Sequence, residues 1–182
     1  MNPVTDGQFV KPHVVATHFH IREGDVIADF GTGTGFFLPT LSKLVGDTGR
    51  VYACEIQKNL VEAVGNQSRQ ASLSNIQVLW CDLEEPNGIK IADNTLDAGM
   101  LVNTLFIIED RVSAVAEIKR TLRPGAKLFV IDWTESFAGM GPTSDHVIVK
   151  DEAIALFEGQ GFIFEREYPA GEHHYGIAFR KL

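Results

Sequence analysis

The sequence predicts an α/β protein, in which helices cover both faces of a mainly parallel β-sheet. Apolar runs of strand length alternate with segments of helical period along most of the chain, a pattern typical of such sheets. A glycine-rich turn follows the first apolar run, and acidic residues stand at the ends of the first three runs. Near the other end of the chain, two runs joined by a short turn indicate an antiparallel pair.

The first part of the chain alternates regularly between the two kinds of element. Helices are expected at residues 12–19, 35–44 and 58–72. Pro12 suits the first turn of a helix, and Gly46 and Gly49 flank the turn that ends the second one. Gly65 lowers the helix propensity of the third. The strands between them are expected at residues 26–30, 50–55 and 76–81.

The second part of the chain contains two long predicted loops. Residues 84–95 and 134–149 are rich in turn-forming residues and lack a helical period. Arg123-Pro124-Gly125 is expected to form a turn, as is the segment 169–172. The helices here are expected at residues 110–122 and 151–158, and the strands at 96–102, 127–133, 162–168 and 173–180.

Length and composition favour one globular domain. The chain has 182 residues, of which 45% are hydrophobic and 22% are charged, values close to those of globular proteins. We therefore predict a single domain over residues 1–182, in which the segment 1–23 with its short helix lies over the mouth of the ligand site. The sequence shows no signal-peptide pattern and no apolar stretch of membrane-spanning length, so we expect a cytoplasmic protein.

The net charge and the positions of Cys and His count against nucleic-acid substrates, a disulfide and a metal site. The formal net charge is -8 without a dense run of Lys and Arg, which disfavours nucleic-acid substrates. Cys54 and Cys81 lie inside predicted strands, the usual setting of small buried side chains, so we expect no disulfide. His13 and His18 do not have the helical spacing of metal ligands, and we predict no metal site.

The segment 26–36 carries the strongest functional signal, because an apolar strand runs directly into Gly31, Gly33 and Gly35. Alternate glycines permit a sharp turn and let a ligand lie against bare peptide groups. The dinucleotide fingerprint G-x-G-x-x-G needs a glycine where this chain has Phe36. The spacing therefore predicts a nucleotide-like cofactor and counts against an NAD-dependent dehydrogenase.

Acidic side chains at the ends of the next strands extend this predicted site, because open parallel sheets bind ligands at the carboxyl ends of their strands. Glu55 follows Gly35 at close to the interval of about 20 residues at which an acid binds a ribose diol. Asp82 is a candidate acceptor for the exocyclic amine of adenine, and Asp29 for loop amides or an ammonium group. Taken alone, each acid is as consistent with a structural role as with ligand binding: Glu55 and Asp82 as solvated strand ends, and Asp29 as a turn cap.

Together, Asp29, the G-x-G-x-G loop, Glu55, Asp82 and the Leu-Arg-Pro-Gly turn resemble class I S-adenosylmethionine-dependent methyltransferases, and in particular the ubiquinone and menaquinone biosynthesis group. The resemblance implies a Rossmann-like sheet of order 3-2-1-4-5-7-6 with the last strand antiparallel. It also implies S-adenosylmethionine as cofactor and methyl transfer to a small or medium-sized acceptor. The cofactor residues that it implies are Asp29, Gly31, Thr32, Gly33, Gly35, Glu55, Ile56, Asp82, Leu83 and Asn103.

Departures from related patterns count against some acceptors. Val102-Asn103-Thr104-Leu105 differs from the D/N-P-P-Y motif of enzymes that methylate nucleobase amines. Arsenite methyltransferases need several thiolates for a soft metalloid, and this chain has two cysteines. An RNA or protein methyltransferase, and a binding module without turnover, remain alternatives. The sequence predicts neither the acceptor nor the oligomeric state.

Methyl transfer from a sulfonium is an in-line displacement, so alignment supplies much of the rate without a nucleophilic residue. An acceptor that loses a proton would need a base. With the last strand beside strand five, we hypothesise that Asp132 or one of the histidines His146, His173 and His174 is that base or an acceptor-site ligand, with Tyr175 close by. Phe36, Phe106, Trp133 and Phe137 are candidates for an apolar acceptor pocket, although aromatic residues at such positions are as often ordinary core.

Overall fold

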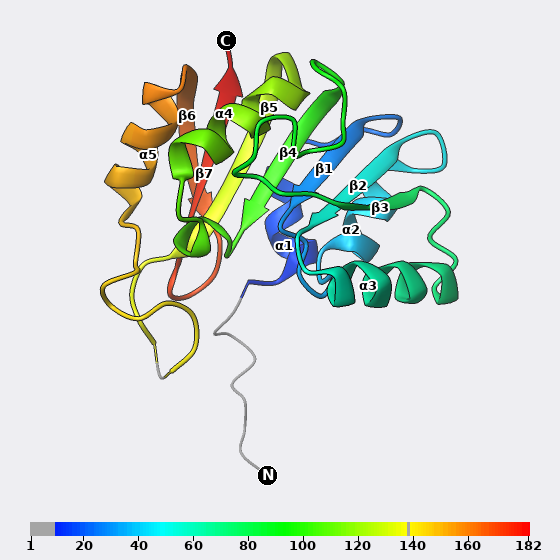
Figure 1. Ribbon diagram of the computed structural model, residues 1–182, viewed down its shortest axis with the longest axis horizontal. Coiled ribbons are helices and arrows are strands. Elements are labelled where there is room, and N and C mark those ends of the chain that lie inside the picture. Colours follow the sequence, from blue (N-terminus) through cyan, green and yellow to red (C-terminus); the bar gives the residue numbers. More distant parts are fainter. Residues whose placement is uncertain (1–9, 138) are drawn as a thin grey trace.

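The computed structural model describes residues 10–137 and 139–182, and its strands form a single sheet (Figure 1). The strands are β1 (Val26–Phe30), β2 (Arg50–Glu55), β3 (Ile76–Trp80), β4 (Leu96–Val102), β5 (Leu122–Trp133), β6 (Phe162–Pro169) and β7 (His174–Lys181). Their order is β3-β2-β1-β4-β5-β7-β6, and β7 is antiparallel to both of its neighbours. The predicted sheet order is confirmed.

Helices cover both faces of this sheet. They are α1 (Pro12–Val15), α2 (Leu38–Val45), α3 (Lys58–Gln70), α4 (Arg111–Thr121) and α5 (Lys150–Gly159), with the 3₁₀ turns η1 (Ala16–His18) and η2 (Leu105–Ile107). One buried cluster joins α4 and α5 to the sheet through Ile118 and Phe157, and another joins α1 and α2 to the opposite face through Val15 and Leu41. Leu41 of α2, Ile118 of α4 and Phe157 of α5 lie on the buried sides of their helices, as the helical period predicts.

Three local features differ from the sequence-based expectation. The helix expected from Gly35 begins instead at Leu38, because Gly35 has a φ of 78°, which a helix does not accommodate. The segment 123–125 lies within β5 and does not form a separate turn. Leu122 pairs with Leu96, and the register shifts before Ala98 at an irregularity that accommodates Gly125 at a φ of 81°. The turn η2 was not predicted.

The segment 84–95 contains no helix or strand, as expected, and a buried acidic side chain holds it in place. Glu117 of α4 accepts a hydrogen bond from the Ile89 amide at 3.0 Å and is bound by Arg120 at 2.7 Å. Arg120 also donates to the carbonyls of Ile89 and Ile91 and pairs with Asp93. These bonds fix the loop against α4 although it lacks regular structure.

The carboxyl ends of the parallel strands meet at one edge of the sheet, the edge toward which the arrowheads of β1, β4 and β5 point in Figure 1. In the β5–β7 register, Asp132 pairs with Tyr175 and Trp133 with His174, so the terminal hairpin reaches this edge as predicted. On the face that carries α1, Phe19 stacks on Phe129 with ring centroids 4.5 Å apart. The N-terminal segment predicted over the ligand site lies outside the described residues as far as residue 9.

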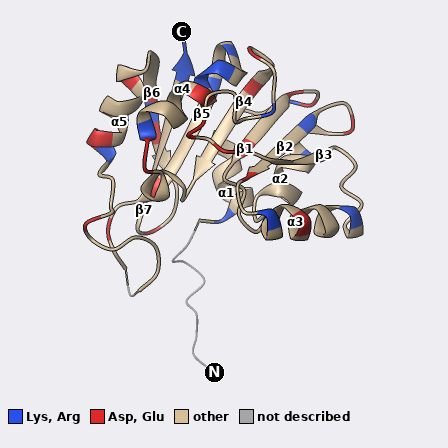
Figure 2. Cartoon of the chain, in the orientation of Figure 1, with Lys and Arg blue, Asp and Glu red and all other residues tan. Residues whose placement is uncertain are grey.

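Acidic and basic segments are interspersed over helices and loops in the part of the chain that Figure 2 colours. Among residues 10–137 and 139–182, no helix combines the length and apolar character that crossing a bilayer requires.

Candidate functional site

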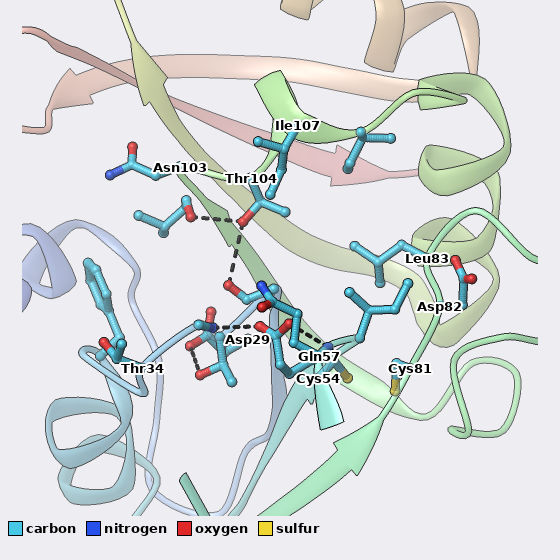
Figure 3. A pocket seen from close by; sticks show the side chains of 18 of the residues that line it. Asp29, Thr34, Cys54, Gln57, Cys81, Asp82, Leu83, Asn103, Thr104 and Ile107 are labelled. Carbon is cyan, nitrogen blue, oxygen red and sulfur yellow. Dashed lines mark hydrogen bonds between the residues drawn. The ribbon is translucent and has the colours of Figure 1, made fainter. Parts of the chain in front are cut away.

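A cavity of about 370 Å³ opens at the carboxyl ends of β1, β2 and β4 (Figure 3). This volume lies in the range of cofactor and small-molecule sites. Apart from Gly35, every cofactor residue predicted from the sequence lines it: Asp29, Gly31, Thr32, Gly33, Glu55, Ile56, Asp82, Leu83 and Asn103. Residues from four separate segments therefore converge on one site.

The three glycines of the loop have different roles. Gly31 has a φ of 76°, and a Cβ there would lie 2.6 Å from the side chain of Thr104, so it permits close approach of the β4 end. Gly33 has a φ of 55° and open space where a Cβ would stand, which leaves its peptide accessible to a ligand. Gly35 faces away from the cavity, and its missing Cβ makes room for Leu38, at 3.0 Å, and Val64, at 3.3 Å. It supports the packing of α2 and α3 instead of lining the cavity.

Glu55 closes β2 as a buried carboxylate that organises the loop. One oxygen accepts the Gly33 amide hydrogen at 3.0 Å, and the other accepts that of Gln57 at 2.9 Å. A carboxylate has about four lone-pair sites, so both oxygens can still accept a hydroxyl hydrogen. This geometry fits a ribose diol, because the two acceptors are held rigidly side by side.

Asp29 lies at the base of the cavity and is 3% exposed. Burial raises its pKa to about 6, and the nearby charge of Glu55 acts in the same direction. A hydrogen bond of 2.7 Å from the Thr32 hydroxyl opposes the shift. A buried carboxylate that is costly to ionise is suited to a cationic group, which would restore its ordinary pKa.

The predicted adenine end of the cavity is formed by Asp82 and Leu83 together with Glu84, which the sequence reasoning missed. Asp82 accepts the Glu84 amide hydrogen at 3.0 Å. Trp80 donates its indole hydrogen to the Ile56 carbonyl at 2.7 Å, which fixes the chain directly after Glu55.

Other lining residues were also missed by the sequence reasoning, namely Thr34, Phe37, Cys54, Gln57, Cys81, Val102, Thr104, Ile107 and Ile108. Cys54 and Cys81 immediately precede the two acids, and this adjacency was the signal available for them. A hydrogen bond between the two thiols raises the pKa of Cys54 and lowers that of Cys81.

Asn103 supplies an acceptor that has no partner among the described residues. Its backbone φ is 51°, and its backbone N–H donates a hydrogen bond to the Ile131 carbonyl at 2.8 Å. Its side-chain oxygen is buried without a hydrogen bond. Because such atoms are normally paired, this one is consistent with a missing ligand donor. Together with the open face of Gly33 and the lone pairs of Glu55, it fits a cofactor that carries an ammonium group and a ribose.

Asp132, one of the candidate bases, is engaged in holding the backbone. Its oxygens accept the amide hydrogens of Leu105 at 2.9 Å and Trp133 at 2.8 Å, which anchors η2 to β5. It is 1% exposed, and burial raises its pKa to about 6. Tyr175 lies beside it in the register, and burial and the charge of Asp132 raise the pKa of that phenol. Asp132 does not line the cofactor cavity.

Two of the candidate histidines, His174 and His146, lie in different surroundings. His174 is buried against Trp133, with ring centroids 4.3 Å apart, and burial lowers its pKa. Its Nδ1 lies 2.8 Å from the Glu172 carbonyl, whereas Nε2 is buried without a partner among the described residues. His146 is exposed and lines a second cavity of about 540 Å³, where Thr143 binds its Nδ1.

The candidate acceptor aromatics are dispersed. Phe36 lines the cofactor cavity and Phe106 lines the second cavity. Trp133 packs against His174, and Phe137 stacks on His173. These four side chains do not line one common cavity.

Comparison with known proteins agrees with this geometry. A family model described as a methyltransferase domain matches residues 28–130. The ubiquinone/menaquinone biosynthesis C-methyltransferase UbiE of Haemophilus ducreyi is 28% identical over 116 residues, which are 63% of this chain and 44% of that protein. The chain spans about half the length of the curated relatives that it matches.

Solved structures extend the similarity over nearly the whole chain. A SAM dependent methyltransferase from Aquifex aeolicus superposes with a TM-score of 0.88 at 30% identity, covering 96% of this chain and 91% of that one. The [4+2]-cyclase SpnF has a TM-score of 0.80 at 15% identity, covering 98% and 88%, and shares the fold alone. The matches confirm the resemblance seen in the sequence and the cofactor that it implied. The family model covers more than half of the chain, and the chain therefore belongs to the S-adenosylmethionine-dependent methyltransferases.

Proposed function

We propose that this protein transfers the methyl group of S-adenosylmethionine to a small or medium-sized organic acceptor. The observation that carries the proposal is the buried Glu55 carboxylate bound to the Gly33 amide inside a cavity of about 370 Å³. When bound, the cofactor supplies a methyl group already activated for displacement. The protein then has to hold and align the two reactants, and this needs no nucleophilic side chain.

The charge of the cavity supports this cofactor. Four carboxylates line it, from Asp29, Glu55, Asp82 and Glu84, and none of its described lining residues is Lys or Arg. A ligand with a sulfonium, an ammonium and one carboxylate carries a net positive charge, and such surroundings attract it. We assign Glu55 to the ribose, Asp82 and Leu83 to the adenine, and Asp29 with Asn103 to the ammonium.

Among the candidate bases, His174 has a buried ring nitrogen without a partner among the described residues. A carbonyl oxygen only accepts, so the Glu172 carbonyl requires the proton on Nδ1 and leaves Nε2 as a bare lone pair. Burial keeps this ring neutral, since it lowers the pKa. Asp132 already binds two amides, and His146 is exposed on the second cavity. We therefore propose His174 as the base; it lines neither cavity, so an acceptor must displace the Trp133 ring that packs against it to reach Nε2.

A base suits an acceptor that loses a proton on methylation, such as a hydroxyl or a carbon acid. The relative from Haemophilus ducreyi is named a C-methyltransferase, which supports the second of these. The exposed apolar side chains of Phe36 and Ile107 at the cofactor cavity favour an acceptor with an apolar body.

Calorimetric titration of the full chain with S-adenosylmethionine, S-adenosylhomocysteine and NAD tests the cofactor assignment. We expect the first two to bind and NAD not to bind. Glu55→Ala should weaken the binding of S-adenosylmethionine at least tenfold, because each of two hydroxyl hydrogen bonds to a charged acceptor contributes about 1.5 kcal/mol or more. Glu158→Ala, on the exposed side of α5, is the matched control and should change nothing. Tight NAD binding, or equal affinities in the two variants, would refute the assignment.

Transfer of a labelled methyl group across a panel of phenols, carbon acids, amines, RNA and protein tests the reaction. Labelling of small organic acceptors is expected, whereas labelling of RNA or protein alone would favour the alternative substrates. A protein that binds the cofactor and methylates nothing would be a binding module. For an accepted substrate at saturating concentration, His174→Gln should abolish the pH dependence of kcat and His146→Gln should leave that pH dependence unchanged. The reverse result would exclude His174 as the base.

A further inference from the structure

We infer that the second cavity, behind η2, binds an oxyanion group of the methyl acceptor, a carboxylate or a phosphate, through Arg111. The inference rests on the proposed function, because it assigns a substrate class to the same reaction. The cavity measures about 540 Å³ and lies between the segment after β4 and the loop that precedes α5. It is therefore large enough for a ring-sized group with a charged substituent.

The position of this cavity connects it to the cofactor site. Ile107 and Ile108 line both cavities, so the two hollows are separated only by the η2 segment. This segment begins one residue after Thr104, which lines the cofactor cavity. An acceptor that reaches across Ile107 would thus occupy the second cavity with one end and approach the cofactor with the other.

Arg111 gives the second cavity its chemical character. It is the lone Lys or Arg among the described residues that line either cavity. Its Nε donates to the Leu105 carbonyl at 3.2 Å, which orients the guanidinium, while its terminal nitrogens make no ion pair with a described carboxylate. Asp132 acts on it only as a nearby buried charge. The two terminal nitrogens are therefore available for a planar oxyanion, which matches their geometry.

The remaining lining residues define the rest of the ligand. Phe106, Ile107 and Pro142 provide apolar surface, and Ile107 is 63% exposed. His146 adds a polar group on the opposite wall, held by Thr143. Glu109 also lines the cavity and opposes an anion, but its side chain is exposed and solvent screens it. A ligand with an apolar body and one oxyanion group therefore matches these lining residues better than a cationic ligand or an uncharged one.

Matched probes test the inference without knowledge of the natural acceptor. The full chain, saturated with S-adenosylhomocysteine, is titrated with 3-phenylpropanoate and with 3-phenylpropanamide, and amide resonances are followed by NMR. The carboxylate should bind up to about fivefold more tightly than the amide, because an ion pair at a partly exposed site contributes up to about 1 kcal/mol. The shifts should centre on Ile107, Glu109 and Thr143. Phenyl phosphate against phenol distinguishes a phosphate from a carboxylate as the preferred oxyanion.

Charge variants make the result specific. Arg111→Gln should remove the preference for the carboxylate, Arg111→Lys should retain part of it, and Glu109→Gln should leave it intact or increase it. Arg69→Gln, which alters a cation hydrogen-bonded to Asn66 on α3, is the matched control and should have no effect. Equal binding of the two wild-type probes, no saturable binding of either, or a preference that persists in Arg111→Gln would overturn the inference. Because none of these readouts involves methyl transfer, their failure is distinguishable from failure of the proposed function, which the binding of S-adenosylmethionine reports.

Discussion

Asp29 allows the strongest quantitative prediction, because its carboxylate is buried and its pKa is displaced. Burial raises that pKa from 3.8 to about 6. Above pH 6 the folded protein must hold a buried charge that the unfolded chain exposes to water. One pKa unit corresponds to about 1.4 kcal/mol, so ionised Asp29 lowers the free energy of unfolding by about 3 kcal/mol. Asp29→Asn removes this cost and keeps an oxygen that accepts the Thr32 hydroxyl hydrogen.

The pH dependence has a defined sign. Between pH 3.8 and 6 the folded state holds more protons than the unfolded state, so the free energy of unfolding falls as pH rises. The contribution is fully present below the unfolded pKa and is lost as pH rises through the folded pKa. Urea unfolding should therefore show Asp29→Asn gaining about 3 kcal/mol over wild type between pH 4 and pH 8. Asp132 titrates in both wild type and Asp29→Asn, so its contribution cancels when their free energies of unfolding are subtracted.

As pH rises, the affinity for the cofactor should increase, whereas the contribution of Asp29 to the free energy of unfolding falls. If Asp29 holds the ammonium group, ionised Asp29 binds it best, and wild-type affinity for S-adenosylmethionine should rise between pH 5 and pH 7. Asp29→Asn should bind more weakly and without this rise, as calorimetry at several pH values would reveal. A stability difference that does not change with pH, or a variant that is less stable at pH 8 than at pH 4 relative to wild type, would refute the reasoning.

Other substitutions separate folding from binding. Gly31→Ala should lower the free energy of unfolding by more than about 2 kcal/mol, from left-handed strain and the overlap with Thr104, and Thr104→Ala should restore part of it in urea unfolding. Gly33→Ala has open space around it, so it should cost only about 1 kcal/mol but weaken S-adenosylhomocysteine binding strongly in calorimetry. Glu117→Ala, which leaves a loop amide and an arginine without their acceptor, should cost about 3 kcal/mol in the same unfolding assay, and a loss below about 1 kcal/mol would contradict this. Trp80→Phe should weaken cofactor binding about fivefold without a comparable loss of stability, which calorimetry and unfolding together would measure.

The features that the sequence predicted are those encoded in short stretches of chain. Gly33 and Glu55 could be identified because the turn needs glycine and because the acid ends a strand at a defined interval. Their contact, the 3.0 Å hydrogen bond from the loop amide to the carboxylate, follows from the parallel pairing of β1 with β2. Alternation of apolar runs and helical periods was enough for the elements, and the resemblance supplied their order.

The features that the sequence did not predict depend on contacts between distant segments. Asp132 was proposed as a candidate base, but the sequence did not show that its two oxygens accept the amide hydrogens of Leu105 and Trp133. Gly35 was expected at the ligand, and the sequence did not show that its missing Cβ makes room for the side chains of Leu38 and Val64.

The cofactor cavity is lined by carboxylates and the second cavity by an arginine, so the charges of the two cavities orient an anionic acceptor between them. The cofactor cavity contains the carboxylates of Asp29 and Glu55 and repels an anionic acceptor, while Arg111 on the far side of η2 attracts it. An acceptor bound by its anion would then present its opposite end to the cofactor, which fixes its direction before any contact with the base. The η2 segment that separates the cavities is held by Asp132, whose oxygen accepts the Leu105 amide hydrogen at 2.9 Å. Asp132 would thus affect the reaction by positioning this wall, and Asp132→Asn should change acceptor selectivity while cofactor affinity stays near that of wild type.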